Sequence, residues 1–381
     1  MAASPVRGRW VLPIVLLVAT ATTTPPARGD FAVSDLGTLG TASRGNGINA
    51  GGMVVGTSDV GGQFGPTHAF REAPSGGIQD LGVISGFDSS SGTGINIYGD
   101  VAGTAFNARG VSHAFRITRV HGPEDLGTLP GGSSSFATAL NGGAVVTGGA
   151  TTSYGATHAF LGGGPGMLVD LGTLPGGGYS VGNAINDADL VAGTASTSYG
   201  ALHAFRSEPG LRGLQDLGTL PGGDSSAGNA INARGDVAGD STVVGGAHHA
   251  FLATVDTRVG GMIDLGLLPG AVESFAYGLN DQDAVVGSAL IAGAGAHAFL
   301  WRPGGMMLDL NQLIPADSGW TLQVATGIDD DGRVTGYGTV DGQVHAFRLD
   351  PRPTAVPAPP SLVLLALGVI GVTIRYKSKR R

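Results

Sequence analysis

Short apolar segments of strand length recur from residue 31 to residue 349, and polar or glycine-rich gaps separate them. In one stretch, for example, the segments cover residues 183–186, 190–194, 203–206 and 214–217. The gaps are rich in Asn, Asp and Gly, which hairpin turns favour. No segment carries an apolar periodicity long enough for a helix. The pattern therefore predicts an all-β protein built from hairpins.

The segments belong to a unit of about 45 residues that occurs seven times. The tripeptide His-Ala-Phe recurs at steps of 45, 45, 45, 46, 48 and 48 residues. Each unit holds four predicted strands, which matches a β-propeller blade. The tripeptides begin at His68, His113, His158, His203, His249, His297 and His345. Asp-Leu-Gly begins at Asp35, Asp80, Asp125, Asp170, Asp216 and Asp264, with a variant at Asp309. An Ile-Asn or Leu-Asn pair ends at Asn49, Asn96, Asn141, Asn186, Asn232 and Asn280, with Asp329 in the seventh place.

The phase of the repeat favours a closed ring. The chain starts on an Asp-Leu-Gly segment at residues 31–36, and the seventh unit ends on its third segment at residues 345–349. The first segment therefore supplies the strand type that the last unit lacks. We predict a seven-bladed β-propeller closed by the N-terminal strand. An irregular stack or an eight-part count is the alternative, whereas an open solenoid would need atypical capping repeats.

Residues 1–29 have the organisation of a secretory signal peptide. Arg7 and Arg9 precede an apolar run over residues 10–21, which ends in small residues. The alternative is a membrane anchor, but the run is shorter than the roughly 20 residues that a spanning helix needs. We expect cleavage between residues 21 and 30.

The C-terminal end has three parts: a Pro-rich linker at residues 351–360, an uncharged stretch at 361–374, and a basic tail to residue 381. We predict a transmembrane helix and a cytoplasmic basic tail over residues 361–381, as either a transient or a permanent anchor. This end resembles the PEP-CTERM sorting signal of Gram-negative bacteria, which an exosortase reads and cuts. The sorting motif is Val356, Pro357, Ala358 and Pro359, with Ala358 in place of the usual Glu. The resemblance implies an exosortase-like processing enzyme as a partner.

The repeat itself resembles the HAF family of probable extracellular repeats. The signatures are His-Ala-Phe and Asp-Leu-Gly-Thr-Leu-Pro-Gly-Gly, which stands at residues 170–177 and 216–223. The resemblance covers nearly all of residues 31–349. It implies export and repetition, and it assigns no reaction.

Composition and charge exclude several classes of protein. The chain has no Cys, which excludes a disulfide scaffold, thiolate metal sites and a cysteine nucleophile. Residues 30–350 hold all 29 acidic side chains but only 12 Arg, a net charge of −17. Such a field opposes binding to nucleic acid and to anionic membrane surfaces.

The repeated His suggests two roles. Seven imidazoles could form a metal ring, but equivalent positions in seven blades converge on one ion only if they line the axis. We therefore expect a structural role, in which each His hydrogen-bonds within its blade, for instance to the Asp of Asp-Leu-Gly. We expect the repeated Asn to satisfy backbone groups at a tight turn. No cofactor or metal is predicted.

Other polar groups are interpreted as turns. The acidic pairs Asp187/Asp189 and Asp281/Asp283 and the run at residues 329–332 lack the spacing of a calcium loop. The Pro-Gly-Gly runs lack the Lys-Ser/Thr of a phosphate loop. A catalytic propeller should show its site as a break in the repeat, and the candidate breaks are residues 109–119 with Arg116 and His121, residues 87–93, and residues 315–320 with Trp320.

These features predict an exported repeat protein of the cell envelope or extracellular matrix that acts as a non-catalytic binding or structural scaffold. It would be membrane-anchored through its C-terminus and then lie at the cell surface or outside the cell. Extracellular polysaccharide or envelope proteins are the expected partners. The alternative is a polysaccharide lyase or hydrolase on one propeller face, with Tyr154, Tyr199, Trp301 and Trp320 as candidate aromatic platforms for sugars.

Overall fold

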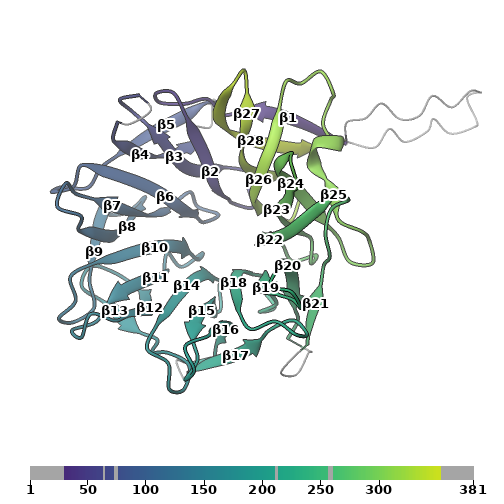
Figure 1. The fold of residues 1–381 in the computed structure, drawn as a ribbon. Helices are drawn as coiled ribbons and strands as arrows, with labels where there is room; N and C mark the ends of the chain where they lie inside the picture. Colours follow the sequence, from purple (N-terminus) through teal and green to yellow (C-terminus); the bar gives the residue numbers. More distant parts are fainter. Residues whose placement is uncertain (1–29, 63–64, 73–75, 211–212, 256–260, 353–381) are drawn as a thin grey trace, which may run out of the picture.

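A computed structural model describes residues 30–352 except 63–64, 73–75, 211–212 and 256–260. These residues form seven four-stranded antiparallel sheets, arranged as blades around a central axis (Figure 1). The predicted all-β, seven-bladed β-propeller is confirmed. Adjacent blades contact one another through their strands all the way round, including the contact between the last blade and the first.

Six blades follow the chain in order. Blade 1 contains β2 (Ser43–Ile48), β3 (Val54–Asp59), β4 (Thr67–Glu72) and β5 (Ile78–Gly82). Blade 2 contains β6 (Ser89–Ile95), β7 (Val101–Phe106), β8 (Ser112–Thr118) and β9 (Gly122–Gly127). Blade 3 contains β10 (Ser135–Leu140), β11 (Val146–Thr151), β12 (Thr157–Gly162) and β13 (Leu168–Asp170). Blade 4 contains β14 (Ser180–Ile185), β15 (Val191–Ser196), β16 (Leu202–Ser207) and β17 (Leu214–Gly218). Blade 5 contains β18 (Ser226–Ile231), β19 (Val237–Thr242), β20 (His248–Ala253) and β21 (Met262–Asp264). Blade 6 contains β22 (Ala271–Leu279), β23 (Val285–Ile291), β24 (Gly295–Trp301) and β25 (Leu308–Asp309), followed by the short 3-10 helix η1 (Leu310–Gln312).

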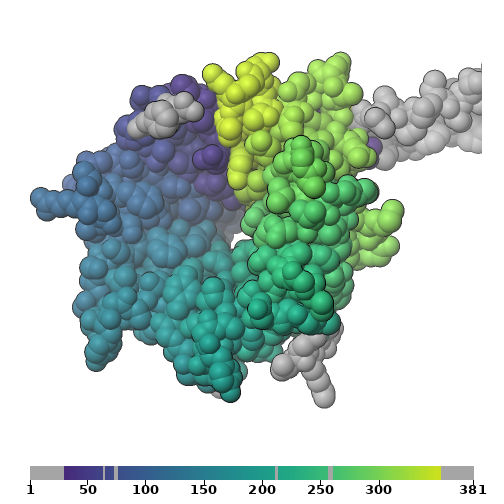
Figure 2. All heavy atoms as spheres, in the orientation of Figure 1, coloured from purple at the N-terminus to yellow at the C-terminus, as the bar shows by residue number. Residues whose placement is uncertain are grey.

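Blade 7 is built from both ends of the chain. It contains β26 (Thr321–Ile328), β27 (Val334–Val340), β28 (Gln343–Pro351) and, at its outer edge, β1 (Phe31–Asp35). β1 pairs antiparallel with β28, and Phe31 is almost fully buried. Figure 2 shows the first residues, in purple, packed against the last strands, in yellow. The N-terminal strand therefore closes the ring, as the phase of the repeat predicts.

The Phe of each His-Ala-Phe tripeptide fills the core of its blade. In blade 4, Phe205 pairs across the sheet with Gly193 of β15, and a Cβ on Gly193 would lie 2.7 Å from the Phe205 ring. The ring thus occupies the space that the missing side chain leaves, which explains why a Gly follows the Val/Ala run of the second strand. The seven rings are at most 1% exposed: Phe70, Phe115, Phe160, Phe205, Phe251, Phe299 and Phe347.

A β-bulge interrupts the first strand of every blade at the same place, and the bulged side chain points to the next blade. Asn46 Nδ2 donates to the carbonyl of Gly92 at 2.7 Å, and Thr326 Oγ1 donates to the carbonyl of Gly45 at 2.9 Å. A bulge turns one side chain out of the strand's alternation, which frees it for this contact. Six of the seven bulged side chains bond this way: Asn46, Thr93, Thr138, Asn183, Asn229 and Thr326.

A second set of contacts joins the blades through a buried Ser. Ser90 of blade 2 accepts a hydrogen bond from Ala69 N of blade 1 at 2.8 Å, and it donates to the carbonyl of Gly82. The serines in this role are Ser43, Ser90, Ser135, Ser180, Ser226 and Ser274. At the remaining interface, Asn311 bonds both backbone groups of Leu322 instead. This contact explains why the seventh Asp-Leu-Gly marker carries Asn.

The terminal predictions fall outside the described residues. The signal peptide at residues 1–29, the sorting motif and the helix and tail at residues 361–381 all belong to this group. Within the described ranges, no helix is long and apolar enough to cross a membrane. The two ends of the described chain lie together, because Arg352 N donates to the carbonyl of Asp30 at 2.8 Å.

Candidate functional site

Each repeated His is bonded to the Asp of an Asp-Leu-Gly marker in its own blade. The His Nδ1 lies 2.8–3.0 Å from the carboxylate in all seven pairs. The contact joins the third strand to the fourth, and in blade 7 it joins β28 to β1 and so holds the ring closed. The pairs are His68–Asp80, His113–Asp125, His158–Asp170, His203–Asp216, His249–Asp264, His297–Asp309 and His345–Asp35.

These pairs are half-buried rather than buried. The His203 and Asp216 side chains, for example, are 21% and 41% exposed. Asp216 Oδ1 also accepts from Gly218 N at 2.8 Å, and Gly218 has a positive φ of 75°. The pair therefore anchors the turn that leaves each blade, and the Gly of the marker supplies the conformation that this turn requires. Among the described residues, no three His, Asp or Glu side chains form a metal-binding group.

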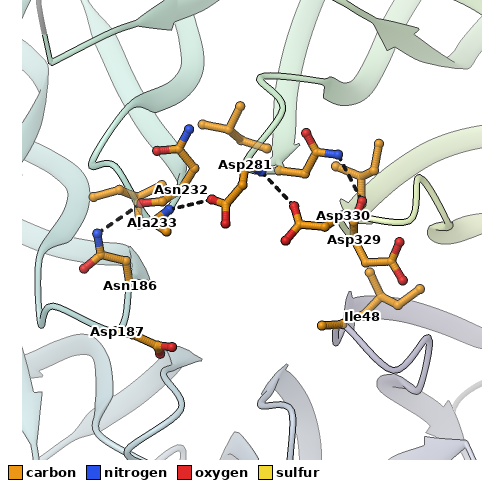
Figure 3. A pocket seen from close by; sticks show the side chains of 13 residues that line it. Ile48, Asn186, Asp187, Asn232, Ala233, Asp281, Asp329 and Asp330 are labelled. Atoms are coloured by element: carbon orange, nitrogen blue, oxygen red, sulfur yellow. Dashed lines mark hydrogen bonds between the residues drawn. The ribbon is translucent and has the colours of Figure 1, made fainter.

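The repeated Asn residues form a ring around the axis, at the face where the first and second strands turn. Asn186 Oδ1 accepts from Ala188 N and Leu190 N of its own turn, both at 3.0 Å. Its Nδ2 donates to the carbonyl of Asn232 in the next blade at 3.0 Å (Figure 3). The sequence predicts the hydrogen bonds to the backbone of the turn, whereas the hydrogen bond to the next blade depends on the tertiary structure. The same link runs from Asn49, Asn96, Asn141, Asn186 and Asn280.

A cavity of about 240 Å³ opens inside this ring, and its lining is acidic (Figure 3). Asp187, Asp281 and Asp330 follow the repeated Asn or its Asp329 equivalent in three blades. Each carboxylate is held by a backbone N–H of the preceding blade, at 2.7–2.9 Å. The three aspartates thus continue the blade-to-blade links toward the axis. The opening of this cavity, which we call the acidic mouth, carries the negative charge of these aspartates. This charge disfavours anionic ligands.

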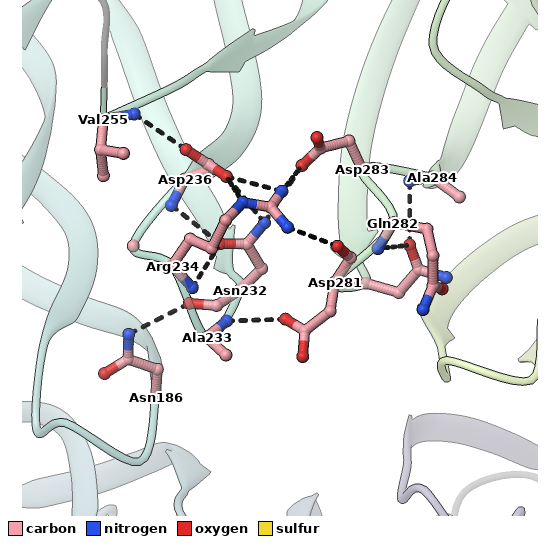
Figure 4. A network of polar contacts seen from close by, with 12 residues as sticks. Asn186, Asn232, Ala233, Arg234, Asp236, Val255, Asp281, Gln282, Asp283 and Ala284 are labelled. Atoms are coloured by element: carbon pink, nitrogen blue, oxygen red, sulfur yellow. Dashed lines mark hydrogen bonds and ion pairs between the residues drawn. The ribbon is translucent and has the colours of Figure 1, made fainter.

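Arg234 follows the cavity-lining Ala233 and links blade 5 to blade 6 (Figure 4). Its Nε donates to Asp236 at 2.9 Å, and its other nitrogens contact Asp283 and the carbonyl of Asp281 in the next blade. Burial alone would lower the pKa of Arg234, but the hydrogen bond and charge of Asp236 raise it above its ordinary value. Arg234 is therefore a charged clamp between blades 5 and 6.

Most of the residues that the sequence marked as breaks in the repeat, and so as catalytic candidates, make structural contacts. Arg116 donates to Glu124 at 2.7 Å and to the carbonyl of Ala144 in the next blade at 2.9 Å. Equivalent arginines make the same link to the next blade elsewhere, so Arg116 belongs to the repeat. His121 is exposed, and its backbone N–H donates to the Thr118 hydroxyl. The equivalent arginines are Arg71, Arg206 and Arg348.

The aromatic candidates divide into two groups. Phe87 lies against His113, with ring centroids 5.2 Å apart, and Trp320 packs edge-on against Phe347. Trp301 is 9% exposed, so its ring has no free face. Tyr154 and Tyr199, in contrast, are fully exposed. Trp301 is therefore a core residue and Trp320 is partly buried against the core, whereas the rings of Tyr154 and Tyr199 are fully accessible.

A break that sequence reasoning missed lies between blades 5 and 6. Asp240 replaces the small residue found at this position in most blades, and its carboxylate contacts His248 Nδ1 at 2.9 Å and Asn229 Nδ2 at 3.0 Å. Burial raises the pKa of Asp240, and the charge of Glu273 adds to that rise. His248 also stacks on the ring of Phe275. The doublet of His248 and the repeat His249 was the signal that could have revealed this site.

Comparison with known proteins supports the fold alone. No protein-family model matches the chain, and no curated protein matches it. Solved structures that are similar include a puromycin-hydrolysing peptidase of Mycobacterium tuberculosis, at 12% identity and a TM-score of 0.53, over 87% of this chain and 54% of that one. A prolyl endopeptidase is 12% identical with a TM-score of 0.50, over 83% and 51%. The BP39L lectin of Burkholderia pseudomallei is 12% identical with a TM-score of 0.44, over 86% and 100%. The chain thus spans about half the length of the two peptidases, and the class it shares with them is the β-propeller.

Proposed function

We propose that this protein is an exported, non-catalytic binding or structural scaffold of the cell envelope or extracellular matrix. The observation that supports this proposal is the use of the repeated polar residues. The repeated His, Asn, Ser and Arg side chains are engaged in hydrogen bonds that hold turns or join blades. A ring built this way presents a rigid, acidic surface.

The proposed cellular location of the protein rests on its two terminal segments. In this proposal, residues 1–29 direct export, and residues 361–381 anchor the chain until an exosortase-like enzyme cuts near Val356–Pro359. Both ends leave the propeller at blade 7, because Asp30 and Arg352 are hydrogen-bonded to each other. The anchor would therefore hold the propeller by that blade.

Fractionation of cells that express tagged copies tests the proposal. We expect the full chain in the envelope fraction, followed by a shorter form at the surface or in the medium. A copy without residues 1–29 should stay in the cytosol, and a copy without residues 361–381 should pass to the medium without an envelope stage. Full-length protein that remains in the cytosol would contradict the proposal.

Asp240 favours a second candidate, a polysaccharide lyase or hydrolase. A carboxyl group with a raised pKa near a second carboxylate is the arrangement used for general acid and base catalysis. Burial and the charge of Glu273 raise the pKa of Asp240, whose carboxylate contacts His248 Nδ1 at 2.9 Å. Release of oligosaccharides by the wild type but not by Asp240→Asn would favour this enzyme over the scaffold. The His203→Ala variant serves as the control, because its change lies in a repeated pair.

A further inference from the structure

Two tyrosines stand at the tips of equivalent hairpins in adjacent blades. Tyr154 lies between β11 and β12, and Tyr199 lies between β15 and β16. They are 96% and 97% exposed, so neither ring contributes to packing. Tyr179 is 39% exposed and lies in the connection that leads from blade 3 into blade 4. All three are on the face opposite the acidic mouth, because these turns lie at the other ends of the second strands.

The backbone beneath the rings is held firmly. In blade 4, Thr197 N donates to the carbonyl of Ala201 at 2.8 Å, which closes the hairpin below Tyr199. Tyr179 N donates to Ser196 Oγ at 3.1 Å, and its carbonyl accepts from Ser196 N at 2.9 Å. The connection and the hairpin therefore form one unit. Aromatic side chains on a fixed backbone bind with little loss of conformational entropy.

The Leu-Pro-Gly-Gly sequence brings these two segments together. Gly177 N donates to the carbonyl of Leu174 at 2.9 Å, as in a β-turn with Pro175 and Gly176 at its centre. A Cβ on Gly177 would lie 1.9 Å from the carbonyl oxygen of Ser196. The connection thus rests directly on the hairpin that carries Tyr199. Gly132 makes the same approach to Thr151 in blade 3.

Polar groups that suit hydroxyl groups lie on the same face. His158 and His203 follow the two tyrosines by four residues, at the start of the third strands. Their partner carboxylates, Asp170 and Asp216, are 42% and 41% exposed and are hydrogen-bond acceptors. A flat ring and an accessible carboxylate together match a sugar, which has an apolar C–H face and a rim of hydroxyls.

We propose that Tyr154, Tyr179 and Tyr199 form a binding surface for a neutral polysaccharide. This inference rests on the proposed scaffold function and names its ligand class. Equivalent rings on adjacent blades fit a ligand that itself repeats, because successive units of one polymer can occupy both sites and gain from avidity. The net charge of −17 over residues 30–350 disfavours a polyanionic polymer.

The position of these blades also suits the proposed anchor. β1 and β28 place both ends of the described chain in blade 7, and blades 3 and 4 lie across the ring from it (Figure 1). A propeller held by blade 7 therefore directs the three tyrosines away from the tether, where a polymer outside the cell can reach them.

Affinity electrophoresis of the purified full chain tests this surface. Native gels would contain dextran, laminarin or galactomannan as neutral probes and alginate as the polyanionic probe. We expect retardation by at least one neutral polymer and none by alginate. Tyr154→Ala and Tyr199→Ala should each weaken retention about 5- to 10-fold, and the double variant more. Val244→Ala, which changes an exposed residue of the equivalent turn in blade 5, should have no effect.

Several outcomes would overturn the inference. These are no retardation by any neutral polymer, retardation by alginate alone, or retention that survives the double Tyr variant. A photocrosslinker at position 154 that reacts on cells with an envelope protein and not with glycan would also overturn it, in favour of a protein partner. The fractionation experiment described above distinguishes failure of this binding surface from failure of the proposed scaffold function. An exported wild type that binds no neutral polymer refutes only this surface, whereas a cytosolic full-length chain refutes the proposed function.

Discussion

The Asn ring makes a quantitative prediction, because blade 7 carries a natural Asp in place of the repeated Asn. Asp329 cannot donate a hydrogen bond as Asn186 does, and its carboxylate instead accepts one from Arg333 Nη1 at 2.9 Å. Arg333 follows Asp329 by four residues, and Leu190 has the same position relative to Asn186. The chain therefore shows which second change should compensate for an Asp in the ring.

The change Asn186→Asp removes the donor to the carbonyl of Asn232 and places a carboxylate against that oxygen. Asn186 is 6% exposed. The carbonyl of Asn232 keeps its hydrogen bond from Gly235 N, so loss of the Asn186 donor costs about 1 kcal/mol, and the buried carboxylate oxygen that replaces this donor has no partner and costs about 1–3 kcal/mol more. We therefore expect the free energy of unfolding to fall by about 2–4 kcal/mol near neutral pH. The added Leu190→Arg should recover about 1 kcal/mol, because an arginine there stays partly in solvent, as Arg333 does.

Urea denaturation of four proteins measures this coupling: the wild type, each single variant and the double variant. Leu190→Arg alone is the matched control, and we expect it to be neutral or mildly destabilising. The reasoning would be refuted if Asn186→Asp left the midpoint unchanged. It would equally be refuted if Leu190→Arg raised stability as much in the wild type as in the Asp variant.

Three further changes test other parts of the ring. Gly177→Ala should destabilise the protein by about 2–4 kcal/mol, because its Cβ would overlap the carbonyl of Ser196. Gly178→Ala, which has open space around it, should be near neutral in the same thermal melts, and equal effects of the two changes would contradict this packing. His203→Ala should cost about 0.5–1.5 kcal/mol, since its pair with Asp216 is half-exposed, and a melting temperature that chelator lowers to the same extent would instead support a metal role. Burial raises the pKa of Asp240 above the ordinary 3.8, so its ionised form destabilises the fold above that raised value, and the penalty disappears as pH falls below the ordinary value. Asp240→Asn should therefore raise the melting temperature at about pH 7 and lose this advantage at about pH 3.5, and an equal gain at both pH values would show that ionisation of Asp240 is not the cause.

The architecture could be predicted from the sequence because each blade repeats its own local signals. The alternation around Phe205, the turn residues after Asn186 and the Gly of each Asp-Leu-Gly marker are local features with a period near 45 residues. Ring closure followed from counting strand types, since residues 31–36 supply the type that the last unit lacks. These inferences need only pairing within a blade.

The site was less predictable because several of its contacts join residues of different blades. Arg116 was expected to be a break, but the interface shows it as a repeated link to the next blade. Asp240 meets His248 across the β19–β20 pair of blade 5, but Glu273, whose charge acts on Asp240, and Phe275, on which His248 stacks, come from blade 6 and approach only when the two blades pack together. The sequence also could not decide which of the candidate aromatic side chains are exposed, since Trp301 is buried and Tyr199 is exposed.

By itself, the sequence determined the strand repeat, the number of blades and the partner that closes the ring, because hydrogen bonding within a sheet depends on residues close together in the unit. Only the tertiary structure decided that the bulged Asn and Thr side chains reach the next blade, that Asp187, Asp281 and Asp330 surround one cavity, and that Tyr154 and Tyr199 stand free on one face. The physical reason is that burial and contact between blades depend on the curvature of the whole ring, which brings together residues from units that are separate along the chain.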